Sequence, residues 1–146
     1  MTLKSQKPGS QWRAFGCLGL VIVTVLGGCA VFIGAVTGGL GDASKAGDAY
    51  FRALGAGDGT TACADMTTNA QVQLTAEYRQ STCPQAVAVL LRSLSTRDRA
   101  QLGATRVSAF KGQGSMAYST CSDNPLQWKQ MVLNEEGNTW LVAQLI

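Results

Sequence analysis

The sequence predicts an α+β fold that follows one transmembrane helix, and three observations lead to this prediction. Residues 14–41 contain no charged side chain. Apolar residues then recur at steps of three and four, the period of a helix, as far as residue 102. From residue 105 onward the period is two, as in a strand. A run of helices followed by a run of strands is typical of an α+β domain, here helices packed on a curved antiparallel β-meander.

The uncharged segment 14–41 has the length of a membrane span. At a rise of about 1.5 Å per residue, a helix from Phe15 to Leu40 would measure about 39 Å, more than a hydrocarbon core of about 30 Å. Basic residues favour the cytoplasmic side of a span, and three precede this one: Lys4, Lys7 and Arg13. We therefore expect residues 1–13 to form a cytoplasmic basic tail and residues 42–146 to form one extracytoplasmic domain at the cell membrane.

Part of the same segment also resembles the lipobox of a bacterial lipoprotein. Leu26-Gly27-Gly28-Cys29 has the pattern at which a signal peptide is cleaved before a lipidated cysteine. The apolar run continues through Val36, however, where a mature lipoprotein normally begins a polar tether. The length of the run favours a span, and Cys29 is the candidate lipidation site of the alternative. Either interpretation holds the domain at the outer face of a membrane.

Small residues recur every four positions within this segment, at Ala30, Gly34 and Gly38. Such a face lets two transmembrane helices approach closely, so it predicts self-association or a protein partner in the membrane. Glycine is also common in spans for structural reasons, and the sequence leaves both interpretations open.

The first part of the outer domain is expected to be helical. In order, the apolar spacing predicts a helix at 46–54, a short turn of helix at 61–66, and helices at 68–78, 81–94 and 96–102. Residues 38–44 are interpreted as a linker from the membrane. Thr67 or Thr68 is expected to cap the helix at 68–78, and Thr82 with Gln85 to form a capping box for the next one.

Four strands rich in β-branched and aromatic residues are expected to complete the domain. They are placed at 105–110, 115–121, 126–133 and 139–145. Segments rich in glycine, asparagine, aspartate and proline separate them, at 111–114, 122–125 and 134–138. Short turns between consecutive strands indicate an antiparallel meander.

Three cysteines lie in the outer domain, where an oxidising compartment permits disulfides. Cys63 and Cys83 form the preferred pair, because both fall in helical segments joined by a short excursion. Closing this loop would contribute about 3 kcal/mol. Cys121 would then be a free thiol on a strand. The alternative, three unpaired buried thiols, stays open because spacing alone does not determine connectivity.

The charge of the outer domain argues against nucleic-acid binding. The chain has 12 basic and 9 acidic residues, and the three basic residues before the span account for the excess. Residues 42–146 are therefore electroneutral, and the arginines between Arg92 and Arg106 are diluted by Asp98. Nucleic-acid binding requires a basic stripe that this domain lacks.

The absence of histidine from the sequence limits the catalytic chemistry that the chain can perform. It removes Ser-His and Cys-His nucleophiles, the usual zinc site and the commonest general base. An acid or base would have to be a carboxylate with a tyrosine nearby, and the candidates are Asp65, Glu77, Tyr78 and Tyr118. Helix capping, solvent exposure and packing are the simpler interpretations of these residues. We expect no catalytic residue, cofactor or metal ligand.

Several segments of the domain resemble those of small membrane-anchored or lipid-anchored extracytoplasmic proteins of high-GC Gram-positive bacteria. These segments are 48–58, 62–67, 83–87 and 136–142. Such proteins are similar in fold to the cystatin-like cone of nuclear transport factor 2 and ketosteroid isomerase. The resemblance implies this cone for residues 42–146. It implies little about function, because this fold hosts enzymes, binding proteins and assembly factors.

The sequence favours a non-catalytic accessory or protein-interaction module of the bacterial cell envelope. The alternative is a lipoprotein that binds a small apolar ligand in the cavity of the cone, and a small cavity enzyme that uses a carboxylate is the third hypothesis. The candidate cavity residues are large and apolar: Leu90, Leu94, Trp128, Met131 and Trp140. The simpler interpretation is that they fill the core, and Trp140 in particular is expected to anchor the final hairpin.

Overall fold

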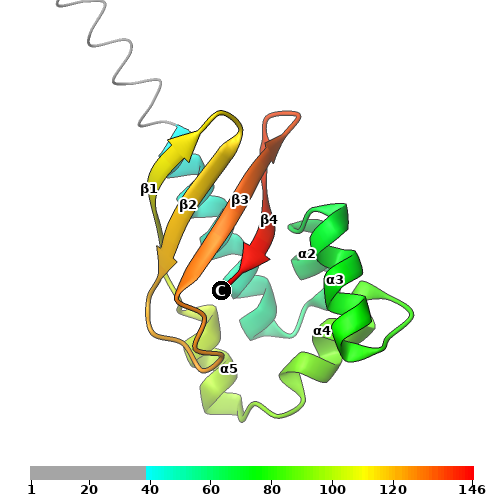
Figure 1. Ribbon diagram of the computed structural model, residues 1–146. Coiled ribbons are helices and arrows are strands. Elements are labelled where there is room, and N and C mark those ends of the chain that lie inside the picture. The colour runs from blue at the N-terminus through cyan, green and yellow to red at the C-terminus, as the bar shows by residue number, and fades with distance from the viewer. Residues whose placement is uncertain (1–38) are drawn as a thin grey trace, which may run out of the picture. The chain divides into compact units, whose positions relative to one another are not determined.

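The computed structural model describes residues 39–146 (Figure 1). Residues 1–13, nearly all of the expected span at 14–41, Cys29, and the small-residue face of Ala30, Gly34 and Gly38 lie outside the described residues. Within residues 39–146, no helix combines the length and the apolar character needed to cross a membrane.

Residues 39–56 form the first described helix, so the expected linker at 38–44 is wrong for residues 39–44. Local side-chain contacts support this extra turn. Ser44 Oγ donates to Leu40 O at 3.0 Å, and Lys45 pairs with Asp42 at 2.9 Å, one helical turn away. Tyr50 and Phe51 are fully buried on this helix. Burial along the helix therefore outweighs the helix-weakening effect of its glycines.

Four shorter helices follow, namely α2 (Gly59–Ala64), α3 (Thr68–Tyr78), α4 (Cys83–Leu91) and α5 (Thr96–Gly103). Thr67 Oγ1 accepts from Ala70 N–H and caps α3, as predicted. The capping box expected at Thr82 is wrong, because the side chain of Thr82 makes no cap hydrogen bond. Ser81 Oγ instead donates to Gln85 Oε1 at 2.8 Å.

The strands are β1 (Val107–Gln113), β2 (Met116–Cys121), β3 (Gln130–Glu136) and β4 (Thr139–Leu145), paired antiparallel in chain order. This confirms the predicted α+β class with a four-stranded meander. The turn at Gly137 and Asn138 has φ of 56° and 68°, the conformation of a tight hairpin turn. β3 begins four residues later than expected, because the Asn124 side chain donates to Ser122 O and Trp128 O and holds 122–129 as a loop.

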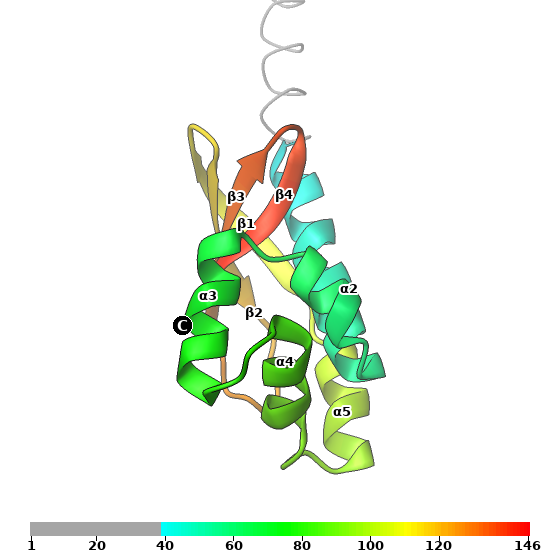
Figure 2. The same cartoon turned by 90° about the vertical axis from the view of Figure 1, so that its right-hand side faces the viewer.

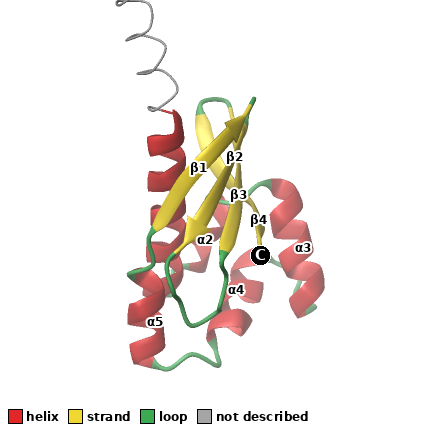
Figure 3. Cartoon of the chain, turned by 60° about the vertical axis from the view of Figure 1, so that its left-hand side comes forward, coloured by secondary structure: helices red, strands yellow, loops and turns green. Residues whose placement is uncertain are grey.

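The core lies between the sheet and the helix at 39–56, which runs behind the strands in Figure 1 and beside them in Figure 2. Alternate sheet residues enter this core and are buried: Ala117, Ser119, Met131, Leu133 and Val142. Figure 3 shows the other face of β1, β2 and β3 turned away from the helices. Met116, Tyr118 and Val132 are half-buried on this outer face.

The two edges of the sheet contact different segments. Along β1, Val107 N–H donates to Asp48 Oδ1 at 2.8 Å and Ala109 N–H donates to Ser44 Oγ at 2.9 Å, both on the helix at 39–56. Along β4, Val142 N–H donates to Asp65 O at 2.8 Å and its carbonyl accepts from Thr67 N–H at 2.9 Å. The loop before α3 thus acts as a one-residue parallel strand beside β4.

Candidate functional site

A cleft of about 310 Å³ opens between α3, α4, β4 and the loop that precedes β3. This volume is at the lower end of the range for small-ligand sites. Most of its lining residues are apolar, although polar groups supply about half of its surface. The lining residues include Gln73, Glu77 and Tyr78 of α3, Leu90 of α4, and Trp128 of the loop. Leu126, Gln144 and Leu145 also line it.

Helix α3 forms one wall because of the spacing of its residues. Ala70, Leu74 and Tyr78 share a face at four-residue steps, as predicted, and all three line the cleft. Gln73 and Glu77 form a neighbouring row, also four apart, and both are exposed. The helix therefore presents an apolar row beside a polar row to the same space.

The C-terminal part of β4 forms the opposite wall. Gln130 and Ile146 exchange both backbone hydrogen bonds, each 3.0 Å long. Hydrogen-bonded and non-hydrogen-bonded pairs alternate in an antiparallel ladder. Leu145 precedes Ile146 in the chain. Its N–H and C=O therefore point away from β3, on the side of the cleft. Beyond Val142 the edge of β4 is thus available for hydrogen bonding.

Trp128 joins the cleft to the core. Its ring centroid lies 6.1 Å from that of Phe51, which is fully buried. The carbonyl of Trp128 accepts from Asn124 Nδ2 at 2.8 Å, and the next residue, Lys129, donates its N–H to Ile146 O at 2.7 Å. The indole is therefore held in place from both sides, although it belongs to a loop.

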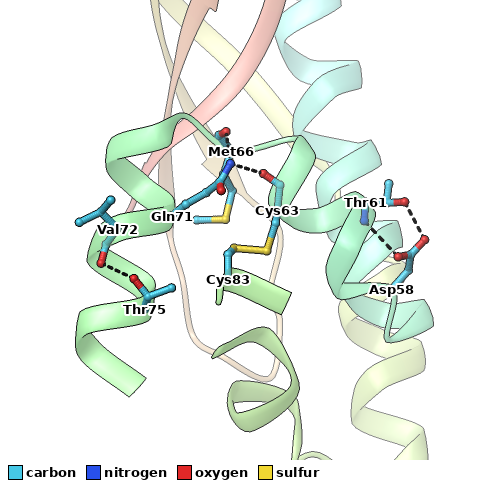
Figure 4. The surroundings of a disulfide bond; sticks show 8 residues. All are labelled: Asp58, Thr61, Cys63, Met66, Gln71, Val72, Thr75 and Cys83. Carbon is cyan, nitrogen blue, oxygen red and sulfur yellow. Dashed lines mark hydrogen bonds between the residues drawn. A yellow bond between two sulfur atoms is a disulfide. The ribbon is translucent and has the colours of Figure 1, made fainter. Parts of the chain in front are cut away.

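The disulfide predicted between Cys63 and Cys83 is present and links α2 to α4 (Figure 4). Gln71 of α3 donates from Nε2 to Cys63 O at 2.8 Å and to Met66 O at 3.2 Å. The disulfide thus ties α4 to α2, and the two hydrogen bonds tie α3 to α2 and to the loop that follows it. Cys121 is free within the described part of the chain, and burial raises the pKa of its thiol to about 11, so it is protonated at neutral pH.

The electrostatics of the cleft are dominated by one carboxylate. Of the described residues that line it, Glu77 alone carries a charge. Burial raises the pKa of the neighbouring Tyr78, and the charge of Glu77 raises it further. Tyr78 is therefore a neutral phenol at neutral pH and can donate a hydrogen bond.

The four candidate acid–base residues do not form one constellation. Glu77 and Tyr78 line the cleft, whereas Tyr118 lies on the outer sheet face with Lys111 Nζ 5.9 Å from its ring centroid. Asp65 is the C-terminal cap of α2, where burial and the charge of Asp58 raise the pKa of its carboxyl.

Sequence reasoning missed a second polar group beside Asp65, the hydroxyl of Tyr50. The Tyr50 hydroxyl and Asp65 Oδ2 are both buried without a hydrogen-bond partner among the described residues. Burial, followed by the charge of Asp65 and then Tyr78, raises the pKa of Tyr50 well above its ordinary value. Tyr50 follows the apolar period of its helix, so the sequence predicts only packing for it.

The expected cavity residues are separated by the fold. Leu90 and Trp128 line the cleft. Met131 is fully buried in the core, because its position on β3 faces the helix at 39–56. Leu94 and Trp140 are partly buried against the core and do not line the cleft. Sequence reasoning did not identify Gln144 and Leu145 as lining residues. They line the cleft because the end of β4 packs near α3, and the sequence does not show that proximity.

The described residues contain no group of three or more histidine, cysteine, aspartate or glutamate side chains that could hold a metal ion. No protein-family model, curated protein or solved structure matches the chain.

Proposed function

We propose that the chain is a membrane-anchored, extracytoplasmic accessory module of the bacterial cell envelope, which acts by binding a protein partner and not by catalysis. We further propose that its domain is a cystatin-like cone, because a helix packs along one face of a curved antiparallel meander. One contrast supports the functional proposal. Side chains fill the core of the domain, whereas the cleft at the edge of the core is open.

Two features support the extracytoplasmic location. Residues 14–41 are uncharged and follow three basic residues, which favours a span with a cytoplasmic N-terminus. The Cys63–Cys83 disulfide belongs to a compartment that oxidises thiols. A reporter fused to the C-terminus should therefore be active outside the cytoplasm, and activity confined to the cytoplasm would refute the location.

The distribution of polar groups supports binding over catalysis. Asp65 caps a helix, Tyr118 lies on the outer face, and Glu77 is exposed at the rim of the cleft. General acid–base catalysis requires such groups within hydrogen-bonding reach of one substrate. A rim with apolar walls and a few polar groups is better suited to recognition.

Photo-crosslinking from the full-length chain in native membranes tests the proposal. A photo-reactive residue at Gln73 should capture a defined protein partner. The matched control is the same residue at Gln101, another exposed helical glutamine that does not line the cleft. Equal yields of the same product from both positions, or no product from Gln73, would contradict a partner at the cleft.

The volume and apolar walls of the cleft favour one second candidate function, the binding of a small ligand with an apolar body. This function is compatible with either a membrane span or a lipid anchor at Cys29. The two candidate functions use different parts of the cleft. A small ligand would contact the interior, whereas a protein partner would contact the rim.

A further inference from the structure

We infer that the cleft binds a small organic cation, an alkylated ammonium group that carries an apolar body. This inference rests on the second candidate function above and adds the charge and shape of the ligand. The juxtaposition that carries it is one unpaired carboxylate, two aromatic side chains and an apolar floor around the same space.

Glu77 supplies the negative charge. It takes part in none of the ion pairs among the described residues. Arg79 lies two residues away at the end of α3 but does not line the cleft. A cation that enters therefore meets a carboxylate that has no competing basic partner, and an anion meets repulsion.

Trp128 and Tyr78 supply the aromatic surfaces. The face of an indole or a phenol ring attracts a cation within about 6 Å of its centroid, and quaternary ammonium groups are recognised in this way. Both rings line the cleft, and contact with Phe51 holds Trp128 in position. A rigid aromatic wall loses little conformational freedom when a ligand binds.

The remaining walls suit the apolar body of the ligand. Leu74, Leu90 and Leu126 offer aliphatic surface. Gln73, Gln144 and the outward C=O of Leu145 add hydrogen-bond acceptors near the rim. The volume of about 310 Å³ accommodates a cation of roughly ten heavy atoms.

Isothermal calorimetry on the full-length protein in nanodiscs tests the inference with three probes that share a hexyl chain. These are hexyltrimethylammonium, 1-hexanol and hexylsulfonate. The ammonium probe should bind about tenfold more tightly than the alcohol, and the sulfonate more weakly than either. Titration of protein-free nanodiscs removes the contribution of the bilayer.

Two matched variants locate the site. Glu77→Gln should weaken binding of the ammonium probe about tenfold and leave 1-hexanol unchanged, because only the charge is removed. Glu135→Gln removes another exposed carboxylate, on β3 and outside the cleft, and should change neither. Trp128→Leu should weaken both probes, and its melting temperature should be measured to confirm that it folds.

The outcomes separate the two levels of the proposal. One outcome is that 1-hexanol binds, that Trp128→Leu weakens its affinity, and that Glu77→Gln leaves the affinity of the ammonium probe unchanged. This outcome overturns the cation inference, and the small-ligand function stands. If none of the probes binds, both are overturned. Binding of hexylsulfonate as tight as that of the ammonium probe also overturns the charge assignment.

Discussion

The two edges of the sheet differ in how completely they are covered. Along β1, the helix at 39–56 supplies Asp48 and Ser44 to two successive outward N–H groups. Along β4, the loop before α3 covers only Val142, and the strand then borders the cleft. An uncovered strand edge is a template for unwanted pairing, so coverage is the default. Residues 110–113 of β1 are exposed as well, but only the uncovered part of β4 borders the cleft, which makes this side the candidate for recognition.

The difference also separates stability from function. Tyr50 and Phe51 of the first helix are fully buried, whereas Gln73 and Glu77 are exposed at the cleft beside β4. We expect substitutions of the buried helix residues to lower the free energy of unfolding most, and substitutions of exposed groups beside β4 to change it least.

The largest effect is expected from Phe51→Ala, at about 4 kcal/mol of unfolding free energy, because the ring is fully buried. Trp140→Ala should cost less, about 2 kcal/mol, since Trp140 is only partly buried. Denaturant unfolding of the full-length chain, followed by fluorescence, measures both. Equal losses would mean that Trp140 is packed as tightly as Phe51.

Gly55→Ala should cost about 3 kcal/mol. A Cβ at Gly55 would lie 2.4 Å from Gly103 Cα and 2.6 Å from Gly103 N, both backbone atoms of α5. Gly103→Ala is the matched control, because its Cβ would lie 3.3 Å from Gly55 Cα. The melting temperature of Gly55→Ala should be far below that of Gly103→Ala. The reverse order would refute the close approach of the Gly55 and Gly103 backbones.

Loss of the disulfide, as in the double variant Cys63→Ala with Cys83→Ala, should cost about 3 kcal/mol. The bond spans 20 residues and holds α4 beside α2, so the cleft should also lose affinity for its ligand. Cys121→Ala is the control and should cost about 1 kcal/mol, because that thiol is unpaired and only half-buried. Non-reducing peptide mapping verifies the pairing, and a link from Cys121 to either partner would contradict it.

Asp48→Ala should cost about 1–2 kcal/mol, because Val107 N–H loses its acceptor at the β1 edge. Asp48→Asn retains an amide oxygen that can accept from Val107 N–H and should cost less. The Arg106 ion pair, at 3.9 Å and largely exposed, adds little. Light scattering during unfolding should also show more aggregation for Asp48→Ala. If the two variants behave alike, the edge hydrogen bond is not what Asp48 contributes.

The smallest effect is expected from Asp65→Asn, beside β4. The folded protein raises the pKa of Asp65 above its ordinary value of 3.8, so folding disfavours the charged form. Stability is therefore lost as pH rises through 3.8 and the folded pKa, and the loss persists at neutral pH. Asp65→Asn should melt slightly higher than wild type at pH 7 and equally at pH 3. A lower melting temperature at pH 7 would show that the charge is stabilising.

Features with local causes could be predicted from the sequence. Thr67 caps α3 through a contact three residues away, and the turn at Gly137 and Asn138 depends on its own backbone. The pairing of Cys63 with Cys83 joins α2 to α4 across a separation of only 20 residues and was also predicted. Residues 39–44 were misassigned because their glycines weaken a helix locally, while packing against the sheet restores it.

The cleft could be predicted only in part. Leu90 and Trp128 were correctly grouped, but Met131 lies two residues after the loop whose length shifts the start of β3. That shift depends on the Asn124 hydrogen bonds and could not be read from alternation alone. Glu77 was identified as a candidate base, and its place in the same cleft as Trp128 follows only from the tertiary packing.

The sequence by itself determined the type of most segments, the net charge of residues 42–146 and the residues able to form a disulfide, because composition and local spacing govern these properties. Only the tertiary structure decided which segment covers each edge of the sheet. The hydrogen bonds from β1 to the first helix join residues 59 and 65 positions apart. Such contacts form when distant segments pack to bury apolar area, and the same packing leaves the end of β4 open to the cleft.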